Sequence, residues 1–235
     1  MSLLSRSAGL LALMLGLGAA AAGAQESSDA FRWYLGGQAG VMSFRTPVQG
    51  RSGVFSTGAN FLVTARRTGL LLSVDEALGD NEQTSFSDIA TGQERSVVFN
   101  DIRKFTAALV AFPVQSRNFE PYVGVGVGLM QVVHPSVQNT VDAGDQAYAQ
   151  TAADEVSTGS FGTLLGGLQL RAGRIALFGQ YQLTTVPSLQ AFFLSSDATV
   201  PAATGRMLNG ATHTFTGGLR FSLGKAREGL GRSDD

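Results

Sequence analysis

Residues 121–130 read PYVGVGVGLM, a stretch in which glycine alternates with valine at every second position. Strict alternation has the period of a β-strand, so the valines share one face while Gly124, Gly126 and Gly128 share the other. A dinucleotide-binding glycine loop would be followed by an amphipathic helix, and no helical pattern follows here. The stretch therefore predicts a strand with one apolar face and one nearly bare face.

The first 24 residues have the pattern of a secretory signal peptide. Arg6 precedes the apolar run LLALMLGLGAAAA, which is too short to span a bilayer, and Ala22 and Ala24 occupy the small-residue positions of a cleavage site. We expect cleavage after Ala24, with an uncleaved anchor as the alternative. Cleavage leaves roughly 210 residues, enough for one domain.

The composition excludes several classes of protein. The chain has no cysteine, so it does not depend on disulfides, and with two histidines it has no pattern of metal ligands. A formal net charge of -1 gives no basic surplus for nucleic acid. No apolar run after the signal peptide is long enough for a transmembrane helix. We therefore expect no nucleic-acid partner, no metal and no cofactor.

The rest of the sequence contains eight segments with the pattern of strands. They are residues 31–44, 54–67, 68–78, 100–114, 119–133, 160–172, 174–186 and 212–223. Alternate connections are of hairpin-turn size, whereas the others are long, at residues 45–53, 79–99, 134–159 and 187–211. This alternation predicts an all-β, eight-stranded, antiparallel up-and-down transmembrane β-barrel over residues 25–224. Short turns are then periplasmic and long loops extracellular.

The two faces of these strands differ in chemistry, as a membrane barrel requires. In the last strand, Phe215, Leu219 and Phe221 alternate with polar residues, and we expect the apolar face to meet lipid. An eight-stranded barrel is only just wide enough for side chains to fill its interior, so small residues such as Gly126 face inward. A network of inward polar residues is expected to plug the lumen, because a lone buried charge is costly. Its predicted members are Asp75, Lys104, Gln169, Gln180, Gln182 and Arg220. Aromatic residues near the strand ends are predicted to form the membrane interfaces, with Trp33, Phe112, Tyr122 and Phe221 at the turn end.

These features resemble the small bacterial outer-membrane β-barrel proteins, the class that includes the transmembrane domain of outer-membrane protein A. In the last strand, the spacing of Thr216, Gly218, Phe221 and Leu223 is similar to the signal read by the barrel-assembly machinery. The resemblance implies a monomer in the outer membrane, with the assembly machinery, membrane lipid and lipopolysaccharide as partners. Residues 225–235 are too few for a peptidoglycan-binding domain and are expected to form a disordered periplasmic tail.

Charge is divided between the two ends of the predicted barrel. Arginines occupy the short turns, whereas acidic residues gather in the long loops, among them Asp142, Asp145, Asp154 and Glu155. This acidic group is interpreted as a solvated loop, with a calcium site as the alternative because hard cations take carboxylate ligands. Acidic loops could also meet lipopolysaccharide through bridging divalent ions.

Three classes of function remain open. The first is a non-enzymatic structural or surface-interaction protein, with weak passage or binding of small molecules left open. The second is an interfacial lipid hydrolase, because His134 and Ser136 resemble the histidine, x, serine arrangement of the lipid A deacylases, which are also eight-stranded barrels. The third is a soluble periplasmic barrel that binds a ligand. The first is the function that we expect.

Overall fold

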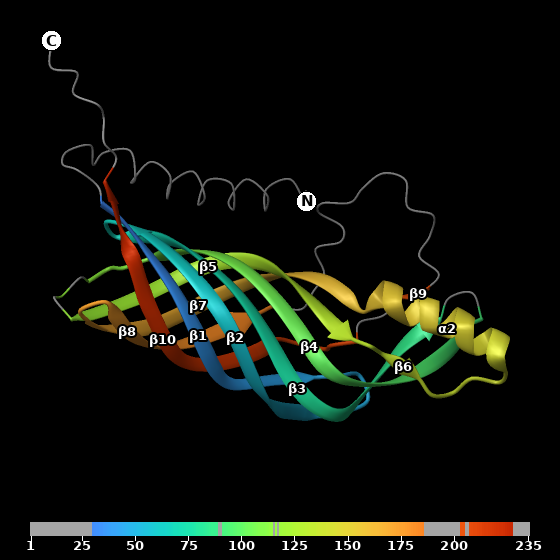
Figure 1. Ribbon diagram of the computed structural model, residues 1–235. Helices are drawn as coiled ribbons and strands as arrows, with labels where there is room; N and C mark the ends of the chain where they lie inside the picture. The colour runs from blue at the N-terminus through green and yellow to red at the C-terminus, as the bar shows by residue number, and fades with distance from the viewer. Residues whose placement is uncertain are drawn as a thin grey trace, which may run out of the picture. The chain divides into compact units, whose positions relative to one another are not determined.

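The computed structural model describes residues 30–88, 91–114, 116, 118–185, 203–204 and 207–227. The predicted signal peptide and residues 228–235 of the predicted tail lie outside this part of the chain. Ten strands and one helix are labelled in Figure 1. Their bounds are β1 Ala30–Arg45, β2 Arg51–Ala65, β3 Thr68–Asp88, β4 Gln93–Ala111, β5 Phe119–Val133, β6 Ser136–Val137, α2 Ala143–Val156, β7 Thr158–Ala172, β8 Ile175–Thr184, β9 Ala203–Thr204 and β10 Thr212–Arg227.

Eight of these strands form one closed antiparallel barrel. The hydrogen-bonded order runs β4-β5-β7-β8-β10-β1-β2-β3, and pairing of β3 with β4 closes the ring. The short strands β6 and β9 only add to the edges of β4 and β3. The barrel confirms the predicted fold class. We call the end at which β2 is followed by β3, β4 by β5 and β7 by β8 the turn end, and the opposite end the loop end.

The loop end contains more regular structure than the sequence predicts. Residues 79–99 are predicted as a loop, but β3 and β4 pair as far as Asp88 and Gln93, across an irregularity between Leu78 and Glu82. Residues 134–159 are also predicted as a loop, and they contain the 14-residue helix α2. Both loop predictions were wrong, because β3, β4 and α2 extend regular structure into segments that were expected to be irregular.

The outward face of the barrel is apolar on all sides. Large side chains that are 40–67% exposed occur on each of the eight long strands. Examples are Leu35, Phe55, Leu72, Leu109, Val125, Leu164, Leu177 and Phe215. A water-soluble protein rarely exposes an apolar surface of this extent, whereas a barrel that meets lipid requires one. Among the described residues, no helix is both long and apolar enough to cross a membrane.

The interior is divided into two apolar clusters with polar residues between them. The cluster toward the loop end includes Met42, Phe44, Phe99, Met130 and Phe161, together with three alanines of α2. The cluster toward the turn end consists of Tyr34, Leu62, Leu71, Ala108, Val110, Phe112, Tyr122 and Leu165. Side chains therefore fill the interior, as expected for eight strands.

The alternating glycines of β5 face this interior, as their period predicts. A Cβ atom on Gly124 would lie 2.6 Å from the Leu109 carbonyl oxygen, and one on Gly128 would collide with the Phe161 ring. The atoms that a side chain at these positions would strike belong to the neighbouring strands β4 and β7, and not to residues across the lumen. Tight contact between adjacent strands is what makes glycine necessary here.

Candidate functional site

The middle of the lumen contains a buried pair of opposite charges. Asp75 of β3 and Lys104 of β4 are cross-strand partners, their side chains are at most 1% exposed, and Lys104 Nζ lies 3.9 Å from Asp75 Oδ2. The ammonium group also donates to Gln182 Oε1 at 2.9 Å and to Thr214 Oγ1 at 3.1 Å. Each charge therefore has a counter-charge or polar partners, which a buried charge requires.

Hydrogen bonds continue from Asp75 toward the turn end. Gln38 donates to Asp75 and accepts from Asn60 at 2.9 Å. Arg220 Nε then donates to Asn60 Oδ1 at 2.7 Å, and its Nη1 donates to Gln169 Oε1 at 2.8 Å. These contacts link strands from opposite sides of the barrel through its centre.

The last part of this chain of contacts reaches the turn end. Gln169 donates to Glu120 at 3.2 Å, and Glu120 forms an ion pair with Arg171 at 2.9 Å. The Arg220 guanidinium also lies over the Phe178 ring, 3.8 Å from its centroid. We call the connected residues the lumen network. They are Gln38, Asn60, Asp75, Lys104, Glu120, Gln169, Arg171, Gln182, Thr214 and Arg220.

The six lumen residues predicted from the sequence are all inside the barrel, with exposed fractions of 0–8%. Five of them belong to the lumen network. The sixth, Gln180, accepts a hydrogen bond from the Tyr122 hydroxyl at 3.0 Å. The predicted set does not contain Gln38 or Glu120, although each lies on the inward face and follows from the period of its strand.

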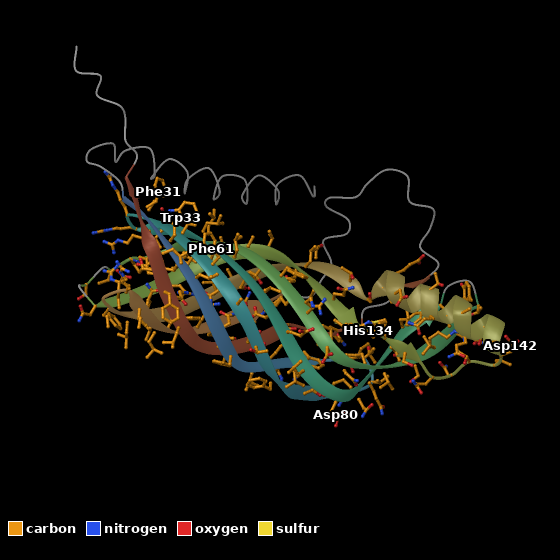
Figure 2. All side chains as sticks on the ribbon, viewed as in Figure 1. Phe31, Trp33, Phe61, Asp80, His134 and Asp142 are labelled. Atoms are coloured by element: carbon orange, nitrogen blue, oxygen red, sulfur yellow. The ribbon has the colours of Figure 1, made fainter. Side chains whose placement is uncertain are left out.

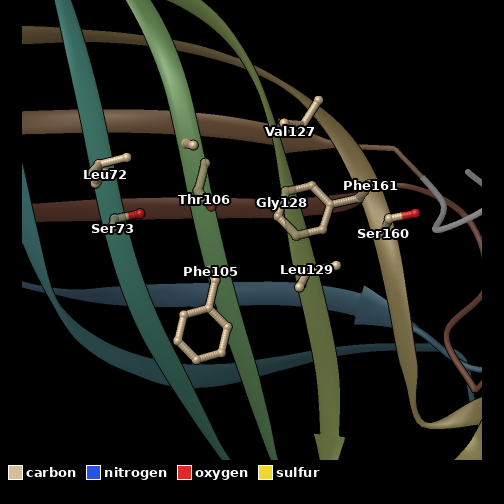
Figure 3. Close-up of a pocket in the computed structure, with 10 residues that line it drawn as sticks. Leu72, Ser73, Phe105, Thr106, Val127, Gly128, Leu129, Ser160 and Phe161 are labelled. Carbon is tan, nitrogen blue, oxygen red and sulfur yellow. The ribbon is translucent and has the colours of Figure 1, made fainter. Parts of the chain in front are cut away.

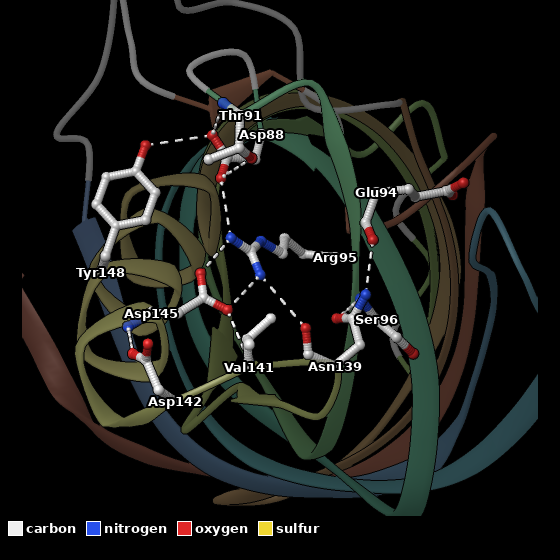
Figure 4. A network of polar contacts seen from close by, with 10 residues as sticks. All are labelled: Asp88, Thr91, Glu94, Arg95, Ser96, Asn139, Val141, Asp142, Asp145 and Tyr148. Carbon is white, nitrogen blue, oxygen red and sulfur yellow. Dashed lines mark hydrogen bonds and ion pairs between the residues drawn. The ribbon is translucent and has the colours of Figure 1, made fainter.

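A second polar site holds α2 at the loop end (Figure 4). Arg95 of β4 is 1% exposed and binds both Asp145 oxygens through its two terminal nitrogens, at 2.6 and 3.0 Å. Its Nη2 also lies 3.4 Å from Asp88 Oδ2, and Tyr148 of α2 donates to Asp88 at 3.2 Å. We call these four residues the helix clamp.

The position of α2 follows from its sequence. The Asp142 side chain accepts from the Asp145 backbone N–H at 2.9 Å, which makes Asp142 the N-cap of the helix. Ala149, Ala152 and Ala153 are buried against the apolar cluster at the loop end. The helix is therefore fixed by a cap, a small apolar face and the helix clamp, and Figure 1 shows it at the loop end.

Electrostatics favour the charged state of the helix clamp. The hydrogen bonds from Arg95 hold the pKa of the Asp145 carboxyl below its usual range. The hydrogen bond to Asp145 in turn raises the pKa of the Arg95 guanidinium, against the opposing effect of desolvation. Bidentate arginine–carboxylate pairs are strong and directional, so they suit the attachment of a helix.

The structure does not assemble a catalytic site at His134 and Ser136. His134 has a positive φ of 49° and is exposed, and Ser136 Oγ accepts from Gln138 at 3.2 Å. No hydrogen bond joins His134 to Ser136 or to an acidic residue in the part of the chain that the structure describes. The nucleophile, base and orienting acid of a hydrolase are thus not brought together.

Two of the four predicted interface aromatics lie inside the barrel, away from the lipid-facing surface. Trp33 and Phe221 are on the outward face, 40% and 52% exposed. Phe112 and Tyr122 are instead 2% exposed inside the barrel, where their ring centroids are 5.8 Å apart. Figure 2 shows Phe61 near Trp33, and these two rings are 5.7 Å apart.

The predicted assembly signal occupies the described part of β10. Thr216 and Arg220 are buried, whereas Phe221 and Leu223 are exposed on the outward face. Gly218 is inward, and a Cβ there would collide with the Gly37 carbonyl oxygen. The strand continues to Arg227, three residues past the predicted end of the barrel.

The acidic residues at 142–155 do not form a metal site in the structure. Asp142 caps α2, Asp145 binds Arg95, and Asp154 accepts from Gln150 at 3.2 Å. Residues 30–88, 91–185 and 203–227, as far as they are described, contain no group of three or more acidic, histidine or cysteine residues able to hold a metal ion.

Comparison with known proteins supports the fold. The sequence matches no protein-family model and no curated protein. The crystal structure of Neisserial surface protein A (NspA) aligns with a TM-score of 0.52 and 11% identity, covering 80% of this chain and 96% of that one. The crystal structure of Ail, the attachment invasion locus protein of Yersinia pestis, aligns with a TM-score of 0.39 and 9% identity, over 84% of this chain and 100% of that one. The chain thus has the fold of the small eight-stranded outer-membrane barrels, the class that its sequence resembles.

Proposed function

We propose that the protein is a non-enzymatic outer-membrane β-barrel with a structural or surface-interaction role. One observation carries the proposal: the wall is apolar on its outer face, while the interior is filled by packed and hydrogen-bonded side chains. Such a barrel is anchored in lipid but has no aqueous channel, which leaves its exposed loop end as the surface for interaction. The extent of the outer apolar face argues against a soluble periplasmic barrel.

The proposed orientation places the loop end outside the cell and the turn end in the periplasm. Its support is the contrast between the ends: the turns are short and carry Arg66, Arg67 and Arg174, and the loop end carries the long hairpin and α2. Outer-membrane barrels have short periplasmic turns and longer extracellular segments. Lipopolysaccharide and the barrel-assembly machinery are the proposed partners.

The lumen network supports a barrel that does not conduct ions. The network crosses the interior between Lys104 and Arg171, and the helix clamp fixes α2 at the loop end. An ion passing through would have to displace buried side chains from the hydrogen bonds that they make to one another, which is costly. In planar bilayers we expect no stepwise conductance from the wild-type protein. Regular single-channel steps would contradict this part of the proposal.

Single cysteines test the orientation, since the natural chain has none. Val141 is 85% exposed beside α2, and Ser116 is exposed in a turn between β4 and β5. A maleimide that cannot cross membranes should label Val141→Cys on intact cells and Ser116→Cys only after lysis. The opposite pattern would overturn the orientation, and labelling of both only after lysis would overturn surface display.

A further inference from the structure

A groove on the outer face of the barrel lies next to a row of polar residues, which is on its loop-end side. The groove has a volume of about 490 Å³ and lies over β3, β4, β5 and β7 (Figure 3). Its lining includes the exposed side chains of Leu72, Phe105, Val127 and Leu129, with Ala107 among them. The short side chain of Ala107 leaves the depression, since its cross-strand partners Leu72 and Val127 are larger.

The strand registers place polar side chains at one edge of this groove. The groove ends toward the loop end at Phe105, Leu129 and Ser160, which are cross-strand neighbours. Two residues farther along the same outward face of these three strands lie Arg103, Gln131 and Thr158, which are also cross-strand neighbours. Two residues of strand correspond to roughly 7 Å. Gln131 and Thr158 are exposed, and the Arg103 side chain is 41% exposed. The surface thus changes from apolar to polar over the distance that separates lipid chains from their headgroups.

From this arrangement we infer that the outer wall binds a phosphorylated, acylated glycolipid of the lipid A type. One acyl chain occupies the groove. The volume of the groove lies within the range of about 300–1,000 Å³ that is usual for small-molecule sites. Arg103 binds a phosphate through its planar guanidinium, while Gln131 and Thr158 hydrogen-bond sugar hydroxyl groups. The amide and the hydroxyl next to the cation favour a sugar-containing headgroup over a simple phospholipid.

Glu76 is expected to weaken lipid binding at this site, because it already pairs with Arg103. It accepts from Arg103 Nη2 at 2.8 Å and is 37% exposed, so the cation already has a partner that a phosphate must share or displace. Exposed ion pairs of this kind contribute little stability, so the exchange has a small cost. Removing the Glu76 charge should therefore strengthen lipid binding, whereas removing Arg103 should weaken it.

The test uses purified full-length protein in detergent and native mass spectrometry, with lipid A as the probe. Ala107→Leu fills the groove. Ala111→Leu is the matched control, because it adds the same bulk to the outward face of the same strand outside the groove. Wild type and A111L should retain lipid A, and A107L should lose it. Equal retention by A107L and wild type would overturn the site.

The headgroup is tested with charge variants and with a second lipid. Retention of lipid A should fall about tenfold in Arg103→Gln, as expected for one charged hydrogen-bonding group, and should rise in Glu76→Gln. Unchanged retention in R103Q, or phosphatidylglycerol retained as well as lipid A, would overturn the glycolipid assignment. A heat-dependent shift in gel mobility verifies that every variant is folded.

This inference rests on the proposed function, because lipid A reaches Arg103 in a cell only if the loop end faces outward. The binding experiment is nevertheless independent of location, since it is done in detergent. Failure of maleimide labelling would refute the orientation without affecting the detergent result. Loss of selective binding would refute the lipid site while leaving the membrane assignment intact.

Discussion

Replacing Lys104 with methionine tests how far the lumen network stabilises the barrel. Lys104 Nζ lies 3.9 Å from Asp75 Oδ2, and both side chains are at most 1% exposed. At an effective dielectric constant of about 20, two unit charges at this separation attract by about 4 kcal/mol. The substitution also leaves the Gln182 and Thr214 oxygens without their donor. We expect K104M to lower the free energy of unfolding by about 3–5 kcal/mol, the usual range for breaking a buried pair from one side.

The double variant Asp75→Asn with Lys104→Met separates charge from packing. It removes both charges and keeps a hydrogen-bonding side chain beside Gln38. Removing both charges leaves no uncompensated buried charge, so the double variant should recover part of the lost stability, while the Gln182 and Thr214 oxygens still lack their donor. Urea unfolding in lipid vesicles measures this, with the emission of Trp33, the only tryptophan, as the signal. A single variant as stable as wild type, or a double variant no more stable than the single one, would refute the reasoning.

Three further predictions concern the wall, the loop end and the hydrolase alternative. Gly128→Val should abolish the folded, heat-shifted band in gels because its side chain would collide with the Phe161 ring, whereas Gly179→Val, with open space around it, should fold. The low pKa of Asp145 means that its stabilising contribution is complete above the ordinary aspartate pKa and is lost as the pH falls through the lower folded value. Protease cleavage within α2 should therefore increase only below about pH 4, and Asp145→Asn should be cleaved at neutral pH as well. Ser136→Ala should leave lipid A acylation unchanged, and altered acylation on mass spectrometry would revive the hydrolase alternative.

The faces of the strands could be predicted from sequence because a strand has a period of two. Asp75, Lys104 and Arg220 are inward for the same reason that Gly126 is inward: each is in phase with the buried residues of its strand. The same rule would have placed Phe112 correctly. Phe112 is two residues from the buried Val110 and therefore in phase with the interior, whereas its position near a strand end wrongly suggests the interface.

The structure of the loop end was not predictable in the same way. The irregularity between Leu78 and Glu82 shifts the phase of β3, so the alternation that marks a strand is interrupted there. In α2 the buried face consists of alanines, which give little hydrophobic contrast. The N-cap residue Asp142 is a sequence signal for the helix, but its charge alone suggests an acidic loop.

The helix clamp and the outer-wall groove depend on contacts that sequence spacing does not encode. Arg95 and Asp145 are 50 residues apart, and Asp88 reaches them from a third element. The groove arises from the registers of neighbouring strands, which place Ala107 between two larger side chains. The alternation of residues along a strand predicts which face a residue occupies. Its neighbours on the adjacent strands depend on the register of the strands in the closed barrel.

Membrane fractionation followed by gel electrophoresis in SDS, with and without boiling, tests the central claim most directly. The claim is that the apolar outer face lies in the outer membrane and that the filled barrel is a closed, stable unit. We predict sedimentation with outer membranes and a change of mobility on boiling, because a closed barrel resists SDS until it is heated. A soluble periplasmic protein whose mobility is the same with and without boiling would contradict the account.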